Sequence, residues 1–312
     1  MFVELYAQTD VGRVRQGNED NFLVLDLASG ENWSGSDGAT EPPAGIRRFE
    51  VGSEGLVLIV SDGMGGALAG DVASRMAVES VREMLTEEDD GHKTDDQGAP
   101  VSLVDCLRNA TGYANYAIHR KSLEDPRCSG MGAPLTAAAV AGQTMDFVQV
   151  GDSRAYVIRG DEIKLATKDQ SLVQQLVDVG QITEEDAETH MFRNVILQAL
   201  GAQSDLTPVV SRVRLQRGDI MLLCSDGLSG KMRAEEMLQI IAAAGGDLAA
   251  ACDALVKEAN KRGGEDNITV VLARFDGADL AAPAPEPITV ELAALEDDKT
   301  LPGTEDDTSP IP

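Results

Sequence analysis

Basic residues are scarce in this chain. Its 312 residues include 26 Lys and Arg against 53 Asp and Glu, which gives a formal net charge of -27. A surface this acidic repels a phosphate backbone, so broad nucleic-acid binding is excluded. The carboxylates are either a solvated surface or, in part, ligands for cations. Composition cannot separate these two interpretations, but the positions of the acids can.

Long hydrophobic runs are also absent. No apolar stretch approaches the ~20 residues that span a bilayer, and residues 1–6 lack the basic start and apolar core of a signal peptide. Cysteine is rare, and no pair has CxxC spacing, which is typical of reduced thiols rather than of a disulfide framework or zinc site. The four cysteines are Cys106, Cys128, Cys224 and Cys252. We therefore expect a cytoplasmic protein without a membrane partner.

The pattern of apolar residues predicts an α+β domain. Apolar and β-branched runs predict two strands between residues 4 and 25 and others at 56–60, 135–141, 145–150, 155–158, 210–214, 220–224 and 268–275. Helical spacing predicts helices at 67–85, 102–122, 170–179, 234–241 and 248–261. Because strands and helices come in separate runs, we expect antiparallel sheets. Residues 28–52 are expected to form a long loop with Trp33 as an isolated exposed aromatic.

The composition changes after Gly277, where large apolar residues become rare and acidic clusters follow at 296–298 and 305–307. Such a segment cannot bury enough surface to offset its ordering entropy. We predict a domain of residues 1–276 and an acidic, disordered tail of residues 277–312. Thr300 and Thr308 lie between acids and a proline, and are hypothetical phosphoacceptors for a phosphothreonine-binding domain. A solubilising tail is the simpler alternative.

Two segments of the chain repeat one design. Each is an apolar strand that ends in Ser-Asp-Gly, with the acids at Asp62 and Asp226. The strand fixes the carboxylate, and the following glycine lets the backbone turn and lets a carbonyl or an ion approach closely. One Asp-Gly after a strand is usually only a turn. Two matching copies indicate a shared role.

Three further acidic sites also lie at predicted strand ends: Glu19-Asp20, Asp152 and Asp266. If the sheets bring these ends together, the carboxylates of five sites converge, and their mutual repulsion requires cations. An all-oxygen shell suits Mg²⁺ or Mn²⁺, whereas three scattered histidines cannot form a typical zinc site. Two such ions ~3.5–4 Å apart can activate water for in-line attack on phosphorus.

Arg15 lies four residues before Glu19. Its planar guanidinium is the group that proteins use to clamp phosphate oxygens. The alternative is an ordinary local ion pair with Glu19 or Asp20. The sequence leaves both interpretations open.

Together these motifs resemble the bacterial metal-dependent protein phosphatases of type 2C, over residues 4–275. The resemblance implies a central β-sandwich of two antiparallel sheets flanked by helix pairs, with the metals in a cleft at one end. The matching motifs, in family order, are Gly12 to Asp20, Ser61-Asp62-Gly63-Met64-Gly65-Gly66, Met131-Gly132, Gly151-Asp152-Ser153-Arg154-Ala155-Tyr156, His190 with Arg193-Asn194, Ser225-Asp226-Gly227-Leu228, and Gly263-Gly264-Glu265-Asp266-Asn267-Ile268-Thr269.

The resemblance also implies a role for each site residue. Two Mn²⁺ or Mg²⁺ ions, and a third weaker one, would be held by carboxylates and one carbonyl, with Arg15 on the substrate phosphate and residues 168–191 as a flap over the site. The implied ligands are Asp62 bridging both ions, the Gly63 carbonyl, Asp20, Asp226 and Asp266 completing the catalytic pair, Glu19 through water, and Asp152 with Asp226 at the third ion.

Three positions depart from the family pattern. Ala133-Pro134 replaces a Thr-Thr pair, and we interpret it as packing. Gln170 replaces a flap histidine. Met64 stands where eukaryotic relatives have a histidine proposed as general acid, so under this interpretation the leaving group is protonated by metal-bound water.

The implied function is hydrolysis of phosphoserine or phosphothreonine in proteins by metal-activated water, without a phosphoenzyme. Serine/threonine kinases and their targets are the expected partners. His190 and Cys224 are interpreted as structural. One alternative is a catalytically silent phosphoprotein-binding relative, which would be expected to lack a ligand. Another is a hydrolase of small phosphate esters or nucleotides.

Overall fold

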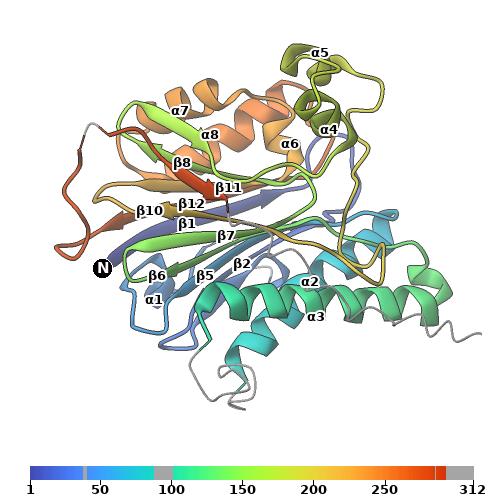
Figure 1. Cartoon of the computed structure of the whole chain (residues 1–312), viewed down its shortest axis with the longest axis horizontal. Helices are drawn as coiled ribbons and strands as arrows, with labels where there is room; N and C mark the ends of the chain where they lie inside the picture. The colour runs from blue at the N-terminus through green and yellow to red at the C-terminus, as the bar shows by residue number, and fades with distance from the viewer. Residues whose placement is uncertain (38–40, 88–100, 285, 293–312) are drawn as a thin grey trace, which may run out of the picture.

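The computed structural model describes residues 1–37, 41–87, 101–284 and 286–292. Two antiparallel sheets lie face to face at its centre (Figure 1). The six-stranded sheet has the order β4 (Arg48–Glu50), β1 (Phe2–Asp10), β12 (Ile268–Asp276), β11 (Ile220–Cys224), β8 (Arg154–Arg159), β9 (Glu162–Leu165). The seven-stranded sheet has the order β13 (Val290–Leu292), β10 (Val209–Arg214), β7 (Thr144–Val150), β6 (Leu135–Ala141), β5 (Leu56–Asp62), β2 (Asp20–Asp26), β3 (Asn32–Ser34).

Helix pairs cover the outer faces of the sheets, which gives four layers (Figure 1). Helices α2 (Ala67–Thr86) and α3 (Leu103–Glu124) pack on the seven-stranded sheet, and α7 (Ala234–Ala243) and α8 (Leu248–Lys261) on the six-stranded one. The short helices are α1 (Ala44–Arg47), α4 (Leu172–Asp178), α5 (Glu184–Thr189) and α6 (Asp226–Ser229). Helices α4 and α5 project beside one end of the sandwich. The expected fold class is confirmed.

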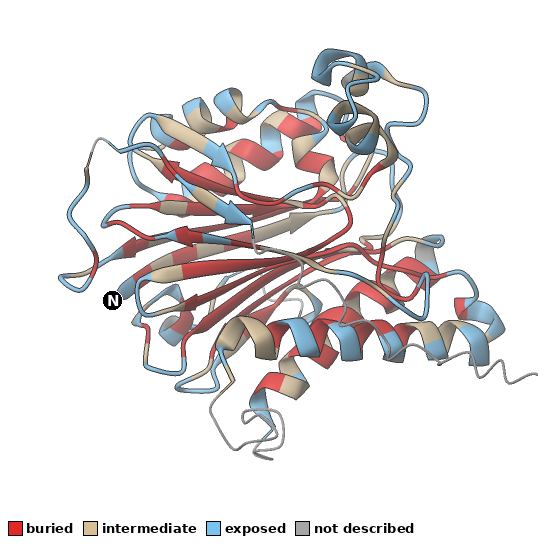
Figure 2. Ribbon diagram, in the orientation of Figure 1, coloured by how far each residue is buried: buried red, intermediate tan, exposed pale blue. Residues whose placement is uncertain are grey.

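Strand alternation explains why the central strands are continuous apolar runs. In β5, Leu58 and Val60 point into the core between the sheets, while Val57 and Ile59 point to the core beneath α2 and α3. Successive side chains of a strand face opposite sides, so a strand covered on both faces must be apolar throughout. Figure 2 shows this burial along the strands of both sheets. The sandwich is therefore a rigid support for the residues at its strand ends.

The long loop expected over residues 28–52 is a partial misassignment. The segment contains β3, α1 and β4, and Trp33 on β3 is 1% exposed rather than on the surface. The indole packs edge-on against Phe22, with ring centroids 5.0 Å apart, and against Tyr6 at 5.9 Å. These short elements escape sequence detection because three or four residues are too few to show a period.

The predicted boundary of the acidic tail is also wrong for its first part. Residues 278–284 and 286–292 pack against the domain, with Leu280 and Ile288 buried in the core between the sheets. The segment ends as β13, paired with the edge strand β10, and Asp279 binds the Met1 ammonium at 3.0 Å. Two apolar side chains and an open sheet edge order a segment whose composition alone predicts disorder. Thr300 and Thr308 lie outside the described residues.

No helix in the described ranges is both long and apolar enough to cross a membrane. The four cysteines are free thiols, and three of them are buried.

The Trp33→Ala substitution should lower the free energy of unfolding by about 3–5 kcal/mol, because it empties a fully enclosed aromatic site. Urea unfolding followed by circular dichroism measures this, since the variant lacks the chain's one tryptophan. Leu123→Ala, at a side chain 75% exposed on α3, is the control and should change stability by less than about 0.5 kcal/mol. Equal losses in the two variants would contradict the described packing of β3.

Candidate active site

Asp20 and Asp62 meet at one end of the seven-stranded sheet. Asp20 begins β2 and Asp62 ends β5, and the two residues are direct partners in the antiparallel register. Because neighbouring antiparallel strands run in opposite directions, the start of one and the end of the other share an edge. The strand-end acids that the sequence singles out are thereby brought side by side.

Asp226 and Asp266 lie at the matching end of the other sheet. Asp226 follows β11 and begins α6. Asp266 lies just before β12, with one residue, Asn267, between them. β11 and β12 are antiparallel neighbours, with Cys224 opposite Val270. The two sheets are joined here because the Oδ2 atom of Asp20 accepts hydrogen bonds from the Ser225 and Thr269 hydroxyls, each at 2.7 Å.

Asn267 organises the loop that precedes β2. Its Oδ1 accepts from the Glu19 backbone N–H at 2.8 Å, and its Nδ2 donates to the carbonyls of Val11 at 2.9 Å and Gly17 at 3.0 Å. Sequence reasoning assigned no role to Ser225, Asn267 or Thr269. The signal in the sequence was their place in the two motifs: Ser225 and Asn267 adjoin Asp226 and Asp266, and Thr269 follows Asp266 by three residues.

Burial and repulsion from neighbouring acids raise the pKa values of Asp20, Asp62, Asp152 and Asp226. Burial is the main cause for each. The hydrogen bonds from the Ser225 and Thr269 hydroxyls lower the pKa of Asp20, but burial outweighs them and this pKa still rises to about 7. The pKa of Asp62 is raised further by Asp20, Asp226, Asp152 and Asp266, and that of Asp226 by Asp266. The pKa of Asp152 rises to about 7, with Asp226 as the next cause after burial.

The oxygens of this cluster fit divalent cations. The buried Oδ1 atoms of Asp20 and Asp226 have no hydrogen-bond partner, and an unpaired buried carboxylate oxygen is costly. In the part of the chain that the structure describes, no three Asp, Glu, His or Cys side chains already close around a single point. Orphaned oxygens and like charges nevertheless suit hard cations, which take all-oxygen ligand sets.

Gly63, the residue after Asp62, contacts the backbone of Glu19. The Gly63 N–H donates to the Glu19 carbonyl at 3.0 Å. A Cβ on Gly63 would lie 2.1 Å from the Gly70 carbonyl oxygen, so only glycine allows this close passage of backbones. Glu19 is 5% exposed, and burial raises the pKa of its carboxyl.

Arg15 lies at the rim of the carboxylate cluster. Its Nη2 donates to Asp266 Oδ2 at 2.9 Å, while Nη1 is 3.9 Å from Glu19 Oε1. The pairing is therefore mainly with an acid 251 positions away, and the local pair with Glu19 is loose. The side chain is 45% exposed, which leaves donors for an incoming oxyanion.

Ala133-Pro134, which departs from the family pattern, and His190 and Cys224, which the sequence predicts to be structural, have backbone and packing roles. The Pro134 carbonyl accepts from the Ser61 hydroxyl at 2.9 Å, and Ala133 is fully buried. His190 accepts a hydrogen bond from the Phe192 N–H at 3.2 Å. Cys224 is enclosed, and burial raises the pKa of its thiol to about 12, which is unsuited to a nucleophile.

Buried carboxylates at this density, next to a half-exposed guanidinium, are typical of hydrolases that act on phosphate esters with divalent cations. The comparisons with known proteins agree. Residues 46–272 match the family model described as protein phosphatase 2C. The serine/threonine phosphatase stp of Listeria monocytogenes is 34% identical over 269 residues, covering 86% of this chain and 94% of the relative. The chain belongs to the protein phosphatase 2C family.

Solved structures show the same fold. The crystal structure of the Mycobacterium tuberculosis serine/threonine phosphatase PstP/Ppp superposes with a TM-score of 0.70 at 32% identity, covering 89% of this chain and all of that one. A structure of the PstP catalytic domain, described as a complex with two manganese ions, has a TM-score of 0.67 at 32% identity and covers 88% of this chain and 99% of that one.

The raised pKa of Asp20 predicts a pH-dependent gain from Asp20→Asn in metal-free protein. As the pH rises from about 4 toward 7, the unfolded carboxyl loses its proton before the folded one. The folded state then binds more protons, so wild-type stability falls. We expect Asp20→Asn to raise the free energy of unfolding by about 1–3 kcal/mol at pH 8 and to give no gain at pH 4.

Urea unfolding in the presence of a chelator, at several pH values, tests this expectation. Asp26→Asn, at the opposite end of β2, is a matched control that removes a buried carboxylate outside the cluster. A loss of stability in Asp20→Asn at pH 8 would contradict the described repulsion.

Proposed function

We propose that the protein is a serine/threonine protein phosphatase that uses two divalent cations, Mn²⁺ or Mg²⁺. The observation that supports this most strongly is the meeting of Asp20, Asp62, Asp226 and Asp266 at one end of the sandwich, with unpaired oxygens on Asp20 and Asp226. Membership in the protein phosphatase 2C family assigns the phosphoester chemistry.

Each residue of the site has a proposed task. Asp20, Asp62, Asp226 and Asp266 would hold the two ions together with the Gly63 carbonyl, Glu19 would act through water, and Asp152 with Asp226 would hold a third ion. Bound cations supply Lewis acidity and lower the pKa of water to near neutrality. Arg15 binds the phosphate oxygens of the substrate and orients the ester.

The protein's own residues keep this arrangement fixed. Ser225 and Thr269 hold one oxygen of Asp20, which turns the other toward the cluster. Asp266 holds the Arg15 guanidinium close to the cluster before substrate arrives. Prior orientation of charged groups lowers the reorganisation needed in the transition state.

Serine/threonine kinases and their targets are the proposed sources of substrate. The free state of all four cysteines fits a reducing compartment, and we propose the cytoplasm. A role of the residues after Leu292 in recruiting a phosphothreonine-binding domain is a further proposal, based on the sequence around Thr300 and Thr308.

Asp62→Asn should reduce Mn²⁺-dependent phosphate release from a phosphothreonine peptide by at least about 10²-fold. The reason is that Asp62 lies opposite Asp20 at the centre of the cluster. Asp26→Asn is the control and should retain full activity. A folded wild type that releases no phosphate at saturating Mn²⁺ would instead favour a phosphoprotein-binding relative without turnover. Faster release from nucleotides than from phosphopeptides would favour a small-ester hydrolase.

Arg15→Ala should lower kcat/KM for the phosphopeptide by about 10–100-fold, because a charge-assisted bond to phosphate is lost. Arg15→Lys should recover part of this, since it keeps the charge but not the planar fork. Arg13→Ala, at an exposed residue of the same loop, is the control. Steady-state kinetics distinguishes these cases, and an unchanged kcat/KM in Arg15→Ala would rule out the phosphate role.

A further inference from the structure

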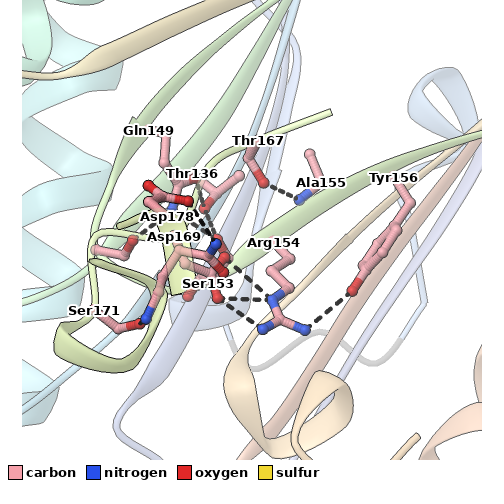
Figure 3. Close-up of polar contacts among 12 residues, drawn as sticks. Thr136, Gln149, Ser153, Arg154, Ala155, Tyr156, Thr167, Asp169, Ser171 and Asp178 are labelled. Atoms are coloured by element: carbon pink, nitrogen blue, oxygen red, sulfur yellow. Dashed lines mark hydrogen bonds and ion pairs between the residues drawn. The ribbon is translucent and has the colours of Figure 1, made fainter. Parts of the chain in front are cut away.

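The loop that contains Asp152 is held from the side of the seven-stranded sheet. It joins β7 to β8 through Gly151, Asp152 and Ser153. Gln149 Nε2 donates to the carbonyls of Gly151 at 2.9 Å and Ser153 at 2.8 Å, and the Thr136 hydroxyl donates to Ser153 at 2.7 Å. Figure 3 shows Thr136, Gln149 and Ser153 close to Arg154, where β8 begins. The loop is thus fixed on one side by buried polar groups.

Gln170, at the start of the next segment, also holds this loop. Its backbone N–H donates to the Gly151 carbonyl at 2.8 Å, and its Oε1 accepts from the Gly151 N–H at 2.9 Å. Its Nε2 donates to the Thr207 carbonyl at 3.0 Å. A primary amide can donate and accept at once, which a carboxylate cannot do.

An ion pair between the half-buried Arg154 and the buried Asp169 reinforces this contact. Arg154 Nε lies 3.1 and 2.9 Å from the two carboxylate oxygens of Asp169, and Nη2 lies 2.7 Å from Oδ2. The Asp169 side chain is 6% exposed. Arg154 Nη1 also points to the Tyr156 hydroxyl at 3.4 Å, so the guanidinium bridges the flap base and β8 (Figure 3).

Within the expected flap of residues 168–191, Asp169 and Gln170 lie at the base, where residues 171–196 leave the domain and, at Leu197, rejoin it. The Leu197 N–H donates to the Gln170 carbonyl at 2.7 Å, and the Leu172 N–H donates to the Val195 carbonyl at 2.9 Å. Between these contacts α4 has no buried residue. Few buried apolar contacts mean low local stability, so the position of the segment depends on the bonds at its base.

We propose that Arg154, Asp169 and Gln170 form a flap anchor, a set of positioning residues that holds the Asp152 loop and the base of the flap in one fixed relation. Its effect on catalysis rests on the proposed function, whereas its effect on the flap does not. Loss of the anchor frees the base of residues 171–196 and lets the Asp152 backbone move.

The same strand supplies a matched control. Arg159, at the other end of β8, makes an equivalent pair with Asp219, at 2.9 Å for Nε–Oδ1 and 2.7 Å for Nη2–Oδ2. Asp219 is 1% exposed. Breaking either pair leaves an uncompensated buried charge and destabilises the fold, but only the Arg154 pair contacts the flap.

Hydrogen exchange of the full-length, metal-free protein tests the anchor without turnover. In Asp169→Asn we expect amide exchange across residues 171–196 and 151–153 to be at least about tenfold faster, and in Asp219→Asn no change there. Gln170→Leu removes the side-chain bonds of Gln170 but keeps the bond from its backbone N–H to the Gly151 carbonyl. It should therefore give a smaller acceleration, confined to the same residues. Unchanged exchange in Asp169→Asn, or the same acceleration in Asp219→Asn, would overturn the proposal.

Kinetics on a phosphothreonine peptide with Mn²⁺ tests the positioning role. Asp169→Asn should lower kcat/KM by about 10–100-fold and raise the Mn²⁺ concentration needed for half-maximal activity, with Arg154→Lys between it and wild type. Asp219→Asn should match wild type after correction for the folded fraction. An equal loss of kcat/KM in Asp169→Asn and Asp219→Asn would contradict the positioning role, because the Arg154–Asp169 pair would then matter only for stability. If the wild type is inactive on phosphopeptides, the proposed function is refuted. The hydrogen-exchange experiment would still show whether the flap anchor holds residues 151–153 and 171–196.

Discussion

The carboxylate of Asp20 accepts hydrogen bonds from Ser225 and Thr269 across the interface between the two sheets, and the site depends on this contact. It joins β2 of one sheet to the ends of β11 and β12 of the other, where buried acids repel one another. The hydroxyls stabilise the charged form of one carboxyl, while burial and Asp226 destabilise it. The fold thus holds acids at close range, and their charged forms are costly unless cations or bound protons compensate them.

The rigidity of the sandwich makes this arrangement possible. Strands such as β5 and β12 are buried on both faces, in the core between the sheets and in the cores beneath the helices. Close-packed interiors resist small displacements, so carboxylates placed at strand ends keep their spacing. The C-terminal residues 278–284 and 286–292 add to this support. Their strand β13 pairs with β10, and Leu280 and Ile288 are buried in the core between the sheets.

Residues 171–196, which include most of the proposed flap, differ from the sandwich in how they are held. Helix α4 has no buried side chain, whereas Asp169 and Gln170 at its base make enclosed polar contacts to β8 and to the Asp152 loop. A rigid acidic cluster and a weakly packed segment therefore meet at one loop. The position of this segment and that of the Asp152 loop are linked there by hydrogen bonds rather than by apolar packing.

The sequence by itself determined the main strands and helices, the repeated strand-Asp-Gly design and the acids of the site, because apolar periodicity and turn chemistry are local properties. Tertiary structure decided the rest. Trp33 is buried by β3, a strand too short to show a period. Arg15 pairs with Asp266 rather than chiefly with its neighbour Glu19, and residues 286–292 are ordered by an edge strand far away in the chain. These contacts join segments that are separated by many residues in the sequence. A local sequence pattern does not predict which donor will pair with which acceptor over such separations.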